Sequence, residues 1–126
     1  MDENQDSEEC YWHLGMCYEK IDNDTKAVDY YKKGLELCND SEYVSDYHLN
    51  IGRSLLMLSR LSEALFHFDK ASEFEGNRLF AMHNKAIVYM CQKNFEKALQ
   101  LLNYVICEGL DNSRIRQHLD YCRNKV

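Results

Sequence analysis

The sequence has no proline and only five glycines among its 126 residues. Because these two residue types interrupt regular backbone structure most strongly, their scarcity predicts helices joined by short connections. A chain of this length buries roughly two-thirds of its unfolded surface, so it can fold without disulfides or a metal. Hydrophobic residues make up 45% and charged residues 29% of the chain, a balance typical of a folded domain and not of a disordered segment.

Basic residues are too few for a nucleic-acid-binding protein. Lysine and arginine number 15 against 21 aspartates and glutamates, which leaves a net charge of −6. Binding to a phosphate backbone requires clustered basic side chains, and here they are scattered among acids. The carboxylates at the start of the chain are expected to interact favourably with the positive end of the first helix dipole, or else to form an acidic tail over residues 1–7 that contacts a partner. The acidic residues among the first nine are Asp2, Glu3, Asp6, Glu8 and Glu9.

Long apolar runs are also missing. No segment approaches the roughly 18 apolar residues that a membrane span requires, and no apolar stretch near the first residue indicates a signal peptide. Six cysteines without such a leader are expected to be reduced thiols. We therefore expect a cytoplasmic protein with no membrane span.

What the sequence does contain is a repeated pattern. Gly15 and Ala27, Gly52 and Ala64, and Ala86 and Ala98 are each separated by 12 positions, and the repeat period is 37 and then 34 residues. The three extra residues precede the second unit and are expected to lengthen its first helix by about a turn, around residues 41–44. The aligned segments are Tyr11–Gly34, His48–Ala71 and Met82–Val105.

The pattern has a physical interpretation. A very small residue in the first helix of each unit allows the second helix to approach closely, and a large residue three positions later lies on the same helical face. The alanine of the second helix is small at the same crossing, and a bulky residue follows it by four positions. The large residues are Tyr18, Leu55 and Tyr89 in the first helices and Tyr31, Phe68 and Leu102 in the second helices.

The chain resembles the tetratricopeptide repeat family, whose signature is W-x-x-L-G-x-x-Y, then A-x-x-x-F, then P. Some signature positions differ. The opening Trp is replaced by Tyr11, His48 and Met82, the Pro by Asn39, Gly76 and Leu110, and Lys85 occupies a position that is apolar in the other units. The resemblance implies an all-α fold, a right-handed superhelical stack of three antiparallel helix pairs with a C-terminal capping helix. We expect a single domain over residues 8–126, with repeats at about 8–41, 45–78 and 79–112 and the cap at about 112–124.

Polar segments between the amphipathic runs predict the loops and helix starts. They are residues 22–24, 39–41, 76–77, 93–94 and 111–113. Ser59 is expected to cap the second helix of the second unit. The last helix is expected to run to about Arg123 and to cover the end of the stack with Ile115, Leu119 and Cys122.

No catalytic motif is present. The sequence has no glycine-rich phosphate loop, no meaningful Ser-His-Asp order and no H-E-x-x-H, so it does not predict an enzyme. Cys10, His13 and Cys17 share one helical stripe, but zinc needs four ligands and no fourth is evident. We expect no metal and no cofactor, and interpret the cysteines as small apolar residues in helix packing. A zinc-binding module is a distant alternative.

The resemblance implies a concave groove lined by the first helices. Transferred to this chain, the partner-binding positions are Trp12, Met16, Leu49, Asn50, Arg53, Phe80, His83, Asn84 and Ile87, with His13 beside them. Relatives that hold extended peptides use asparagines where Asn50 and Asn84 stand, and a carboxamide both donates and accepts as a peptide unit does. The alternative is that these are exposed asparagines without a ligand.

Relatives that bind the C-terminal carboxylate of chaperones carry lysine, arginine and asparagine at five groove positions. The corresponding residues here are Trp12, Met16, Asn50, Phe80 and Asn84, of which Asn50 alone matches. The groove is instead apolar, and Trp12 is its expected anchor because tryptophan is enriched at binding hot spots. Alternatively, Trp12 is buried by residues 1–7 or by a neighbouring molecule.

These observations predict a non-catalytic interaction module, an adaptor or co-chaperone that binds a protein or peptide partner in the groove. Two alternatives remain open: a structural scaffold that forms a homodimer, and a small protein similar to the three-repeat secretion chaperones of bacteria.

Overall fold

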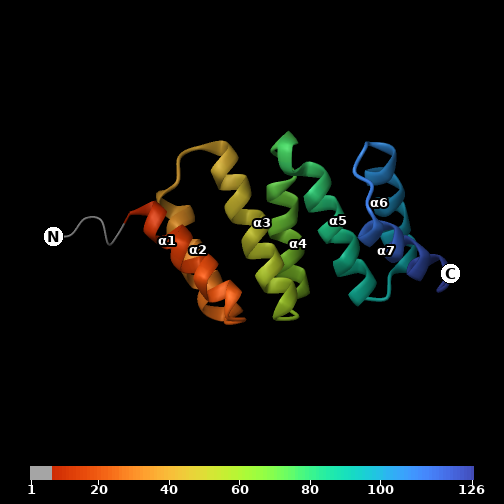
Figure 1. The fold of residues 1–126 in the computed structure, drawn as a ribbon, viewed down its shortest axis with the longest axis horizontal. Coiled ribbons are helices and arrows are strands. Elements are labelled where there is room, and N and C mark those ends of the chain that lie inside the picture. Colours follow the sequence, from red (N-terminus) through yellow and green to blue (C-terminus); the bar gives the residue numbers. More distant parts are fainter. Residues whose placement is uncertain (1–6) are drawn as a thin grey trace.

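The computed structural model describes residues 7–126, and these form seven helices and no strand. Consecutive helices lie side by side as three pairs, and α1 and α7 occupy opposite ends of an elongated stack (Figure 1). The predicted all-α repeat stack with a final helix is confirmed. The helices are α1 Glu8–Lys20, α2 Asp24–Leu37, α3 Ser41–Met57, α4 Leu61–Ala71, α5 Glu75–Cys91, α6 Phe95–Cys107 and α7 Ser113–Arg123. Of the predicted acidic tail, residues 1–6 lie outside the described part of the chain.

Most helix starts lie where the polar segments predict them. Asn23, Asp40, Asn94 and Asn112 each accept a hydrogen bond from a backbone N–H in the first turn of the helix that follows. Such caps satisfy amide groups that have no partner within the helix. The loops inside the three pairs share one more feature. In each loop, the residue seven positions after the small residue of the unit has a φ of 62–63°; these residues are Asp22, Ser59 and Lys93.

Two predicted boundaries are wrong. Gly76 and Asn77 are not in a loop, because α5 begins at Glu75. Asn77 faces α3 instead, where its amide donates to Ser45 at 3.0 Å and to Asp46 at 2.7 Å. Ser59 does not cap α4, because its left-handed backbone turns the chain one residue before the cap position. Arg60 occupies that position, and its side chain bonds to Glu63 and not to the backbone of the first turn.

The predicted lengthening of α3 by the three extra residues is wrong, because α3 and α5 both have 17 residues. The extra residues lie in the preceding helix instead: α2 has 14 residues, whereas the equivalent helix α4 has 11. The third unit contains the charged departure, Lys85, at a position where Leu14 and Ile51 are apolar. The ammonium of Lys85 lies 2.7 Å from the carboxylate of Asp69 and so links α5 to α4. An ion pair between helices replaces an apolar contact at this point.

The small residues produce the predicted close crossings. A Cβ atom added at Gly15 would lie 2.5 Å from the ring of Tyr31, and one added at Gly52 would lie 2.6 Å from the ring of Phe68. Both rings are completely buried, as are Leu102 and the alanines at 27, 64 and 98. The third unit has Ala86 at the same position, and its second helix carries Leu102 in place of an aromatic ring.

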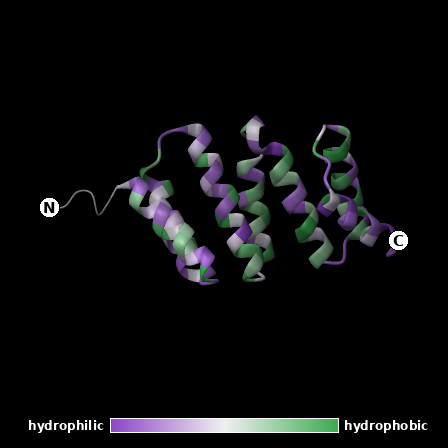
Figure 2. Ribbon diagram, viewed as in Figure 1, coloured by the Kyte–Doolittle hydropathy of each residue, from purple (hydrophilic) through white to green (hydrophobic). Residues whose placement is uncertain are grey.

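The final helix performs the predicted capping role. Ile115, Leu119 and Cys122 are buried against α5 and α6. Polar and apolar residues alternate along α7 and along the other helices, as expected of helices with one face in the core (Figure 2).

The cysteines are only partly as predicted. Cys38 and Cys122 are buried, whereas Cys17, Cys91 and Cys107 are exposed. The packing interpretation is therefore wrong for these three, because their side chains remain exposed to solvent.

The crossing at Gly52 generates a prediction. Replacing Gly52 by Ala should lower the free energy of unfolding by about 1–2 kcal/mol, because overpacking costs about 1–3 kcal/mol and improved helix propensity returns about 0.5–1 kcal/mol. The Gly52→Ala, Phe68→Leu double variant should show a favourable coupling of about 1 kcal/mol, since it recreates the Ala86–Leu102 combination. Urea unfolding of the two single variants and the double variant measures this coupling.

Gly76→Ala provides the control. An added Cβ there meets the ring edge of the partly exposed Phe74 at 2.7 Å, a side chain that has room to move. Its stability should change little, and equal losses at Gly76 and Gly52 would contradict the crossing argument.

Candidate functional site: a groove along the first helices

Three hollows follow one another along the first helices of the repeats. The end pocket, about 420 Å³, lies between α1 and α3 at the start of the stack. The central hollow, about 340 Å³, lies between the same two helices farther along α1, and the main hollow, about 880 Å³, extends to α5 and the start of α7. Trp12 lines the first two hollows, and Glu19 and Arg53 line the last two. The three hollows therefore adjoin one another, and we refer to them together as the groove.

All nine residues that the sequence assigns to partner binding line this groove. Trp12, Met16 and Asn50 line the central hollow. Leu49, Phe80, His83, Asn84 and Ile87 line the main hollow, and Arg53 lines both. The structure brings these side chains together from α1, α3 and α5; their role in binding stays a prediction.

The groove extends farther than the sequence indicated. Lys20, Met57 and Cys91 also line it, each five residues after the small residue of its unit. Glu19 and Leu56 line it one position earlier. The repeat register itself contains this signal, and extending the pattern by one turn identifies these positions. Asn112, Ser113 and Arg114 close the far end; no repeat position indicates them, because they precede or begin the capping helix.

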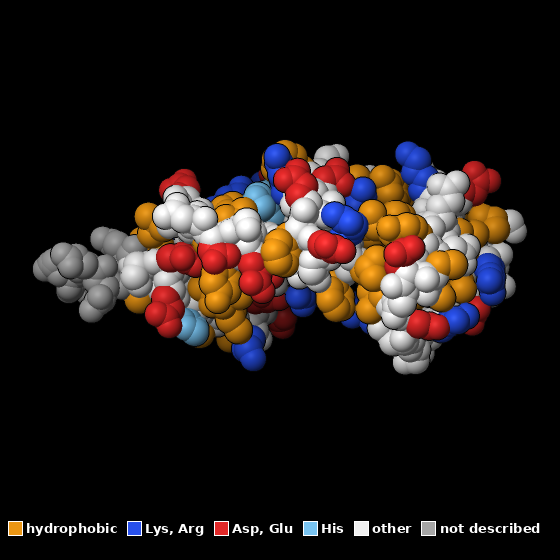
Figure 3. Space-filling model, turned by 90° about the horizontal axis from the view of Figure 1, so that it is seen from above, with side chains coloured by type: hydrophobic (Ala, Val, Ile, Leu, Met, Phe, Trp, Pro, Cys, Tyr) orange, Lys and Arg blue, Asp and Glu red, His pale blue; other side chains and the backbone are white. Residues whose placement is uncertain are grey.

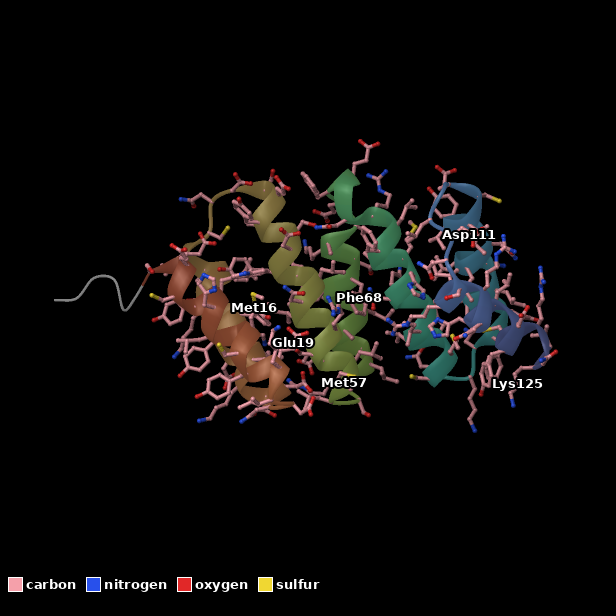
Figure 4. The ribbon with its side chains drawn as sticks, in the orientation of Figure 1. Met16, Glu19, Met57, Phe68, Asp111 and Lys125 are labelled. Atoms are coloured by element: carbon pink, nitrogen blue, oxygen red, sulfur yellow. The ribbon has the colours of Figure 1, made fainter. Side chains whose placement is uncertain are left out.

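The main hollow exposes apolar side chains to solvent. Met57 is 71% exposed and Phe80 is 49% exposed, although both are large and hydrophobic. Met16, Glu19 and Met57 follow one another across α1 and α3 (Figure 4). Elsewhere on the surface, apolar side chains also lie among charged ones (Figure 3). An apolar surface bordered by polar groups is the usual form of a protein-binding site.

Trp12 is held in place by the core. Its ring lies 5.5 Å from that of Tyr31 and 4.9 Å from that of Tyr47, the latter in an edge-on arrangement. The side chain is half-buried and its remaining surface faces two of the hollows. Such a ring contributes contact area without losing much side-chain freedom when a ligand binds.

Glu19 and Arg53 connect α1 to α3 in the groove. The hydroxyl of Tyr31 donates to the Glu19 carboxylate at 2.8 Å, and a guanidinium nitrogen of Arg53 lies 3.9 Å from the other carboxylate oxygen. Burial and the nearby Glu19 carboxylate raise the pKa of Tyr31, so its hydroxyl stays protonated and remains a donor. Arg53, one of the predicted partner-binding residues, therefore already lies near an acid.

The two groove asparagines each use one end of the carboxamide. Asn50 Oδ1 accepts from Arg53 at 3.4 Å, and Asn84 Nδ2 donates to the Phe80 carbonyl at 2.8 Å. In the part of the chain that the structure describes, Nδ2 of Asn50 and Oδ1 of Asn84 have no hydrogen-bond partner. Asn50 thus retains a side-chain donor and Asn84 a side-chain acceptor.

His83 is joined to the capping helix. Its Nε2 lies 3.1 Å from Nδ1 of His118 in α7, so one imidazole donates its N–H to the other. Burial, the neighbouring His118 and Arg114 lower the pKa of His83 to about 4, and burial and Arg114 also lower the pKa of His118. The two neutral rings therefore form one hydrogen bond, and protonation of both rings would break it.

Among residues 7–126, no three histidine, cysteine, aspartate or glutamate side chains gather in the way a metal ion needs. Cys17 and His13 are exposed, and His13 faces Glu9 at 3.7 Å. Within the same residues, every helix is too short or too polar to cross a lipid bilayer.

The histidine pair predicts a pH dependence. An unfolded chain binds a proton at a histidine near pH 6.5, whereas folded His83 binds it only near pH 4. Between these values the unfolded state holds more protons, so the free energy of unfolding should fall as the pH is lowered, by roughly 1–2 kcal/mol for this group. Urea unfolding at pH 7 and pH 4.5, compared with a His83→Gln variant, tests this; equal pH dependence in both proteins would contradict it.

Comparisons with known proteins agree with this architecture. Residues 8–41 match the family model described as tetratricopeptide repeat. The transcriptional activator NprA of Geobacillus stearothermophilus is 28% identical to this chain over 101 residues of alignment, which covers 74% of the chain. The chain spans about a quarter (25%) of the length of that curated relative.

Two solved structures share the fold. The TPR domain of Arabidopsis OM64 has a TM-score of 0.84 at 17% identity, covering 98% of this chain and 99% of that one. The first TPR of Spaghetti (RPAP3), bound to the HSP90 peptide SRMEEVD, has a TM-score of 0.81 at 16% identity and covers 94% of both chains. With the seven-helix stack, these matches show that the chain has the all-α fold of tetratricopeptide repeat domains.

Proposed function

We propose that this chain is a non-catalytic interaction module that binds an extended peptide segment of a partner protein in the groove. The observation that carries the proposal is the row of three adjoining hollows, which side chains of α1, α3 and α5 line. Leu49, Phe80 and Ile87 offer apolar contact area. The side chain of Asn50 offers a donor and that of Asn84 an acceptor for the backbone of a peptide. Tetratricopeptide repeats in general act as such modules and not as enzymes.

The peptide differs from an acidic chaperone tail. The RPAP3 domain of the same fold holds the peptide SRMEEVD. Relatives that bind a terminal carboxylate do so with lysine and arginine, whereas this chain has Trp12, Met16 and Phe80 at the corresponding positions. We expect a ligand that inserts apolar side chains, and a role as a cytoplasmic adaptor or co-chaperone.

Self-association is the second candidate. Met57 and Phe80 expose much of their apolar surface in the groove, and a second copy of the chain offers matching apolar surface. A mass that rises with concentration in analytical ultracentrifugation, and that returns to the monomer value in Phe80→Ser, would favour this candidate over peptide binding.

Selection from a displayed peptide library tests the proposed function. The native protein should select peptides with a common pattern of apolar residues. The Trp12→Ala, Asn50→Ala, Asn84→Ala triple variant should bind the selected peptides at least about tenfold more weakly, since each lost hydrogen bond or contact costs on the order of 1 kcal/mol. Isothermal titration of synthetic copies provides the affinities.

The matched control changes the same number of side chains on the second helices, away from the groove. A Phe66→Ala, Asn103→Ala, Tyr104→Ala variant removes exposed residues of α4 and α6. Circular dichroism establishes that both variants fold. If the control variant loses binding and the groove variant keeps it, the binding site lies on the other face and the proposal fails.

A further inference from the structure

The end pocket differs in chemistry from the rest of the groove. It is lined by three aromatic rings, three carboxylates and one imidazole. The aromatic residues are Trp12, Tyr43 and Tyr47, the acidic residues are Glu8, Glu9 and Asp46, and the imidazole belongs to His13. Neither lysine nor arginine is among the residues that line the pocket, so the carboxylates concentrate negative charge around an aromatic wall.

The carboxylates have donors for only part of their capacity. The hydroxyl of Tyr47 donates to Glu8 at 3.1 Å, and the amide of Asn77 donates to Asp46 at 2.7 Å. Both donors are neutral, so they orient the carboxylates without cancelling their charge. Glu9, in the first turn of α1, has His13 at 3.7 Å. Each carboxylate oxygen accepts more than one hydrogen bond, which leaves acceptors for a further ligand.

The aromatic rings of the pocket also lack a cation that other rings of this chain have. Lysines lie 5.2–5.9 Å from the ring centres of Tyr11, Tyr18, Tyr30, Phe66, Tyr89 and Tyr121. Within the described residues, neither Trp12 nor Tyr43 nor Tyr47 has such a lysine. An ammonium or guanidinium group near an aromatic face is stabilised by the ring quadrupole, and tryptophan gives the strongest effect.

We propose that the end pocket binds a lysine or arginine side chain of the peptide that occupies the groove. This inference rests on the proposed function, since Trp12 joins the pocket to the central hollow and a peptide lying in the groove reaches both. The cation lies between the aromatic faces of Trp12 and Tyr43, and its N–H groups donate to the carboxylates of Glu9 and Asp46. The partner segment is therefore basic at this end and apolar where it meets Leu49, Phe80 and Ile87.

The charge of the chain's own N-terminal segment does not complement the pocket. Residues 1–6 contain Asp2, Glu3 and Asp6 and no lysine or arginine. Carboxylates brought to a pocket that already contains three would be repelled. A basic side chain from another molecule is the occupant that the charges favour.

Small probes test the pocket without the rest of the groove. N-acetyl-arginine amide and the neutral, nearly isosteric N-acetyl-citrulline amide are titrated into the intact chain. Trp12 is the single tryptophan of the chain, so its fluorescence and its indole N–H resonance report on this pocket. We expect millimolar binding of the arginine probe, at least about fivefold tighter than the citrulline probe, which corresponds to a cation–π contribution of about 1 kcal/mol.

Charge-neutralising variants identify the residues. Glu9→Gln, Asp46→Asn retains the size of both side chains and the bond from Asn77, and should remove most of the preference for arginine. The control Glu36→Gln, Asp120→Asn makes the same change of charge at exposed positions outside the pocket and should retain the preference. Raising the salt concentration from roughly 0.05 to 0.5 M should weaken the arginine probe and not the citrulline probe, and this measurement needs no variant.

Equal affinity for the two probes, or equal loss of preference in both variants, would overturn the inference. Its failure is distinguishable from failure of the proposed function. If library peptides bind through Leu49 and Phe80 but the arginine probe shows no preference, the groove binds peptides and the pocket assignment is wrong. If the arginine probe binds as expected but no peptide is selected, the pocket assignment stands and the peptide-binding proposal is wrong.

Discussion

The close approach of the two helices in each pair is the constraint on which the rest of the structure depends. Where Gly15 meets the ring of Tyr31 and Gly52 meets that of Phe68, no Cβ separates the helices, so each ring packs directly on backbone. That contact fixes the angle of the first helix about its own axis. Residues at other angles around that helix, among them Trp12, Asn50 and Arg53, then line the groove. The groove is a consequence of the core packing and not a separate structure.

The sequence predicted those parts of the molecule that repeat. Three copies of one spacing identify the pairs and the crossings, because each copy supports the others. The groove positions came from the resemblance to the tetratricopeptide repeat family. It failed where a residue acts outside the pattern. Gly76 and Asn77 have the composition of a loop, but Asn77 is used to bind Ser45 and Asp46 on a neighbouring helix, and a local signal contains no information about such a contact. The exposure of Cys17, Cys91 and Cys107 is a similar case.

The detailed chemistry of the groove could not be derived from the sequence for a related reason. The pairing of Arg53 with Glu19, and of His83 with His118, joins residues 34 and 35 positions apart on different helices. Which donors and acceptors remain for a ligand depends on these pairings. The sequence identified the residues of the groove, while their available hydrogen-bonding atoms required the positions of the neighbouring helices.

Helix α5 has a position that no other helix shares. Its buried residues are divided between two separate apolar clusters: Ala81 and Val88 pack with the first two helix pairs, and Ala86 packs with α6 and α7. The two clusters are linked mainly through this helix, as expected of a stack in which each unit contacts only its neighbours. The stability of α5 therefore decides whether the molecule unfolds as one unit or loses its C-terminal third first. A ligand that contacts Phe80, His83 and Ile87 would stabilise this helix and so increase the cooperativity of unfolding along the entire stack.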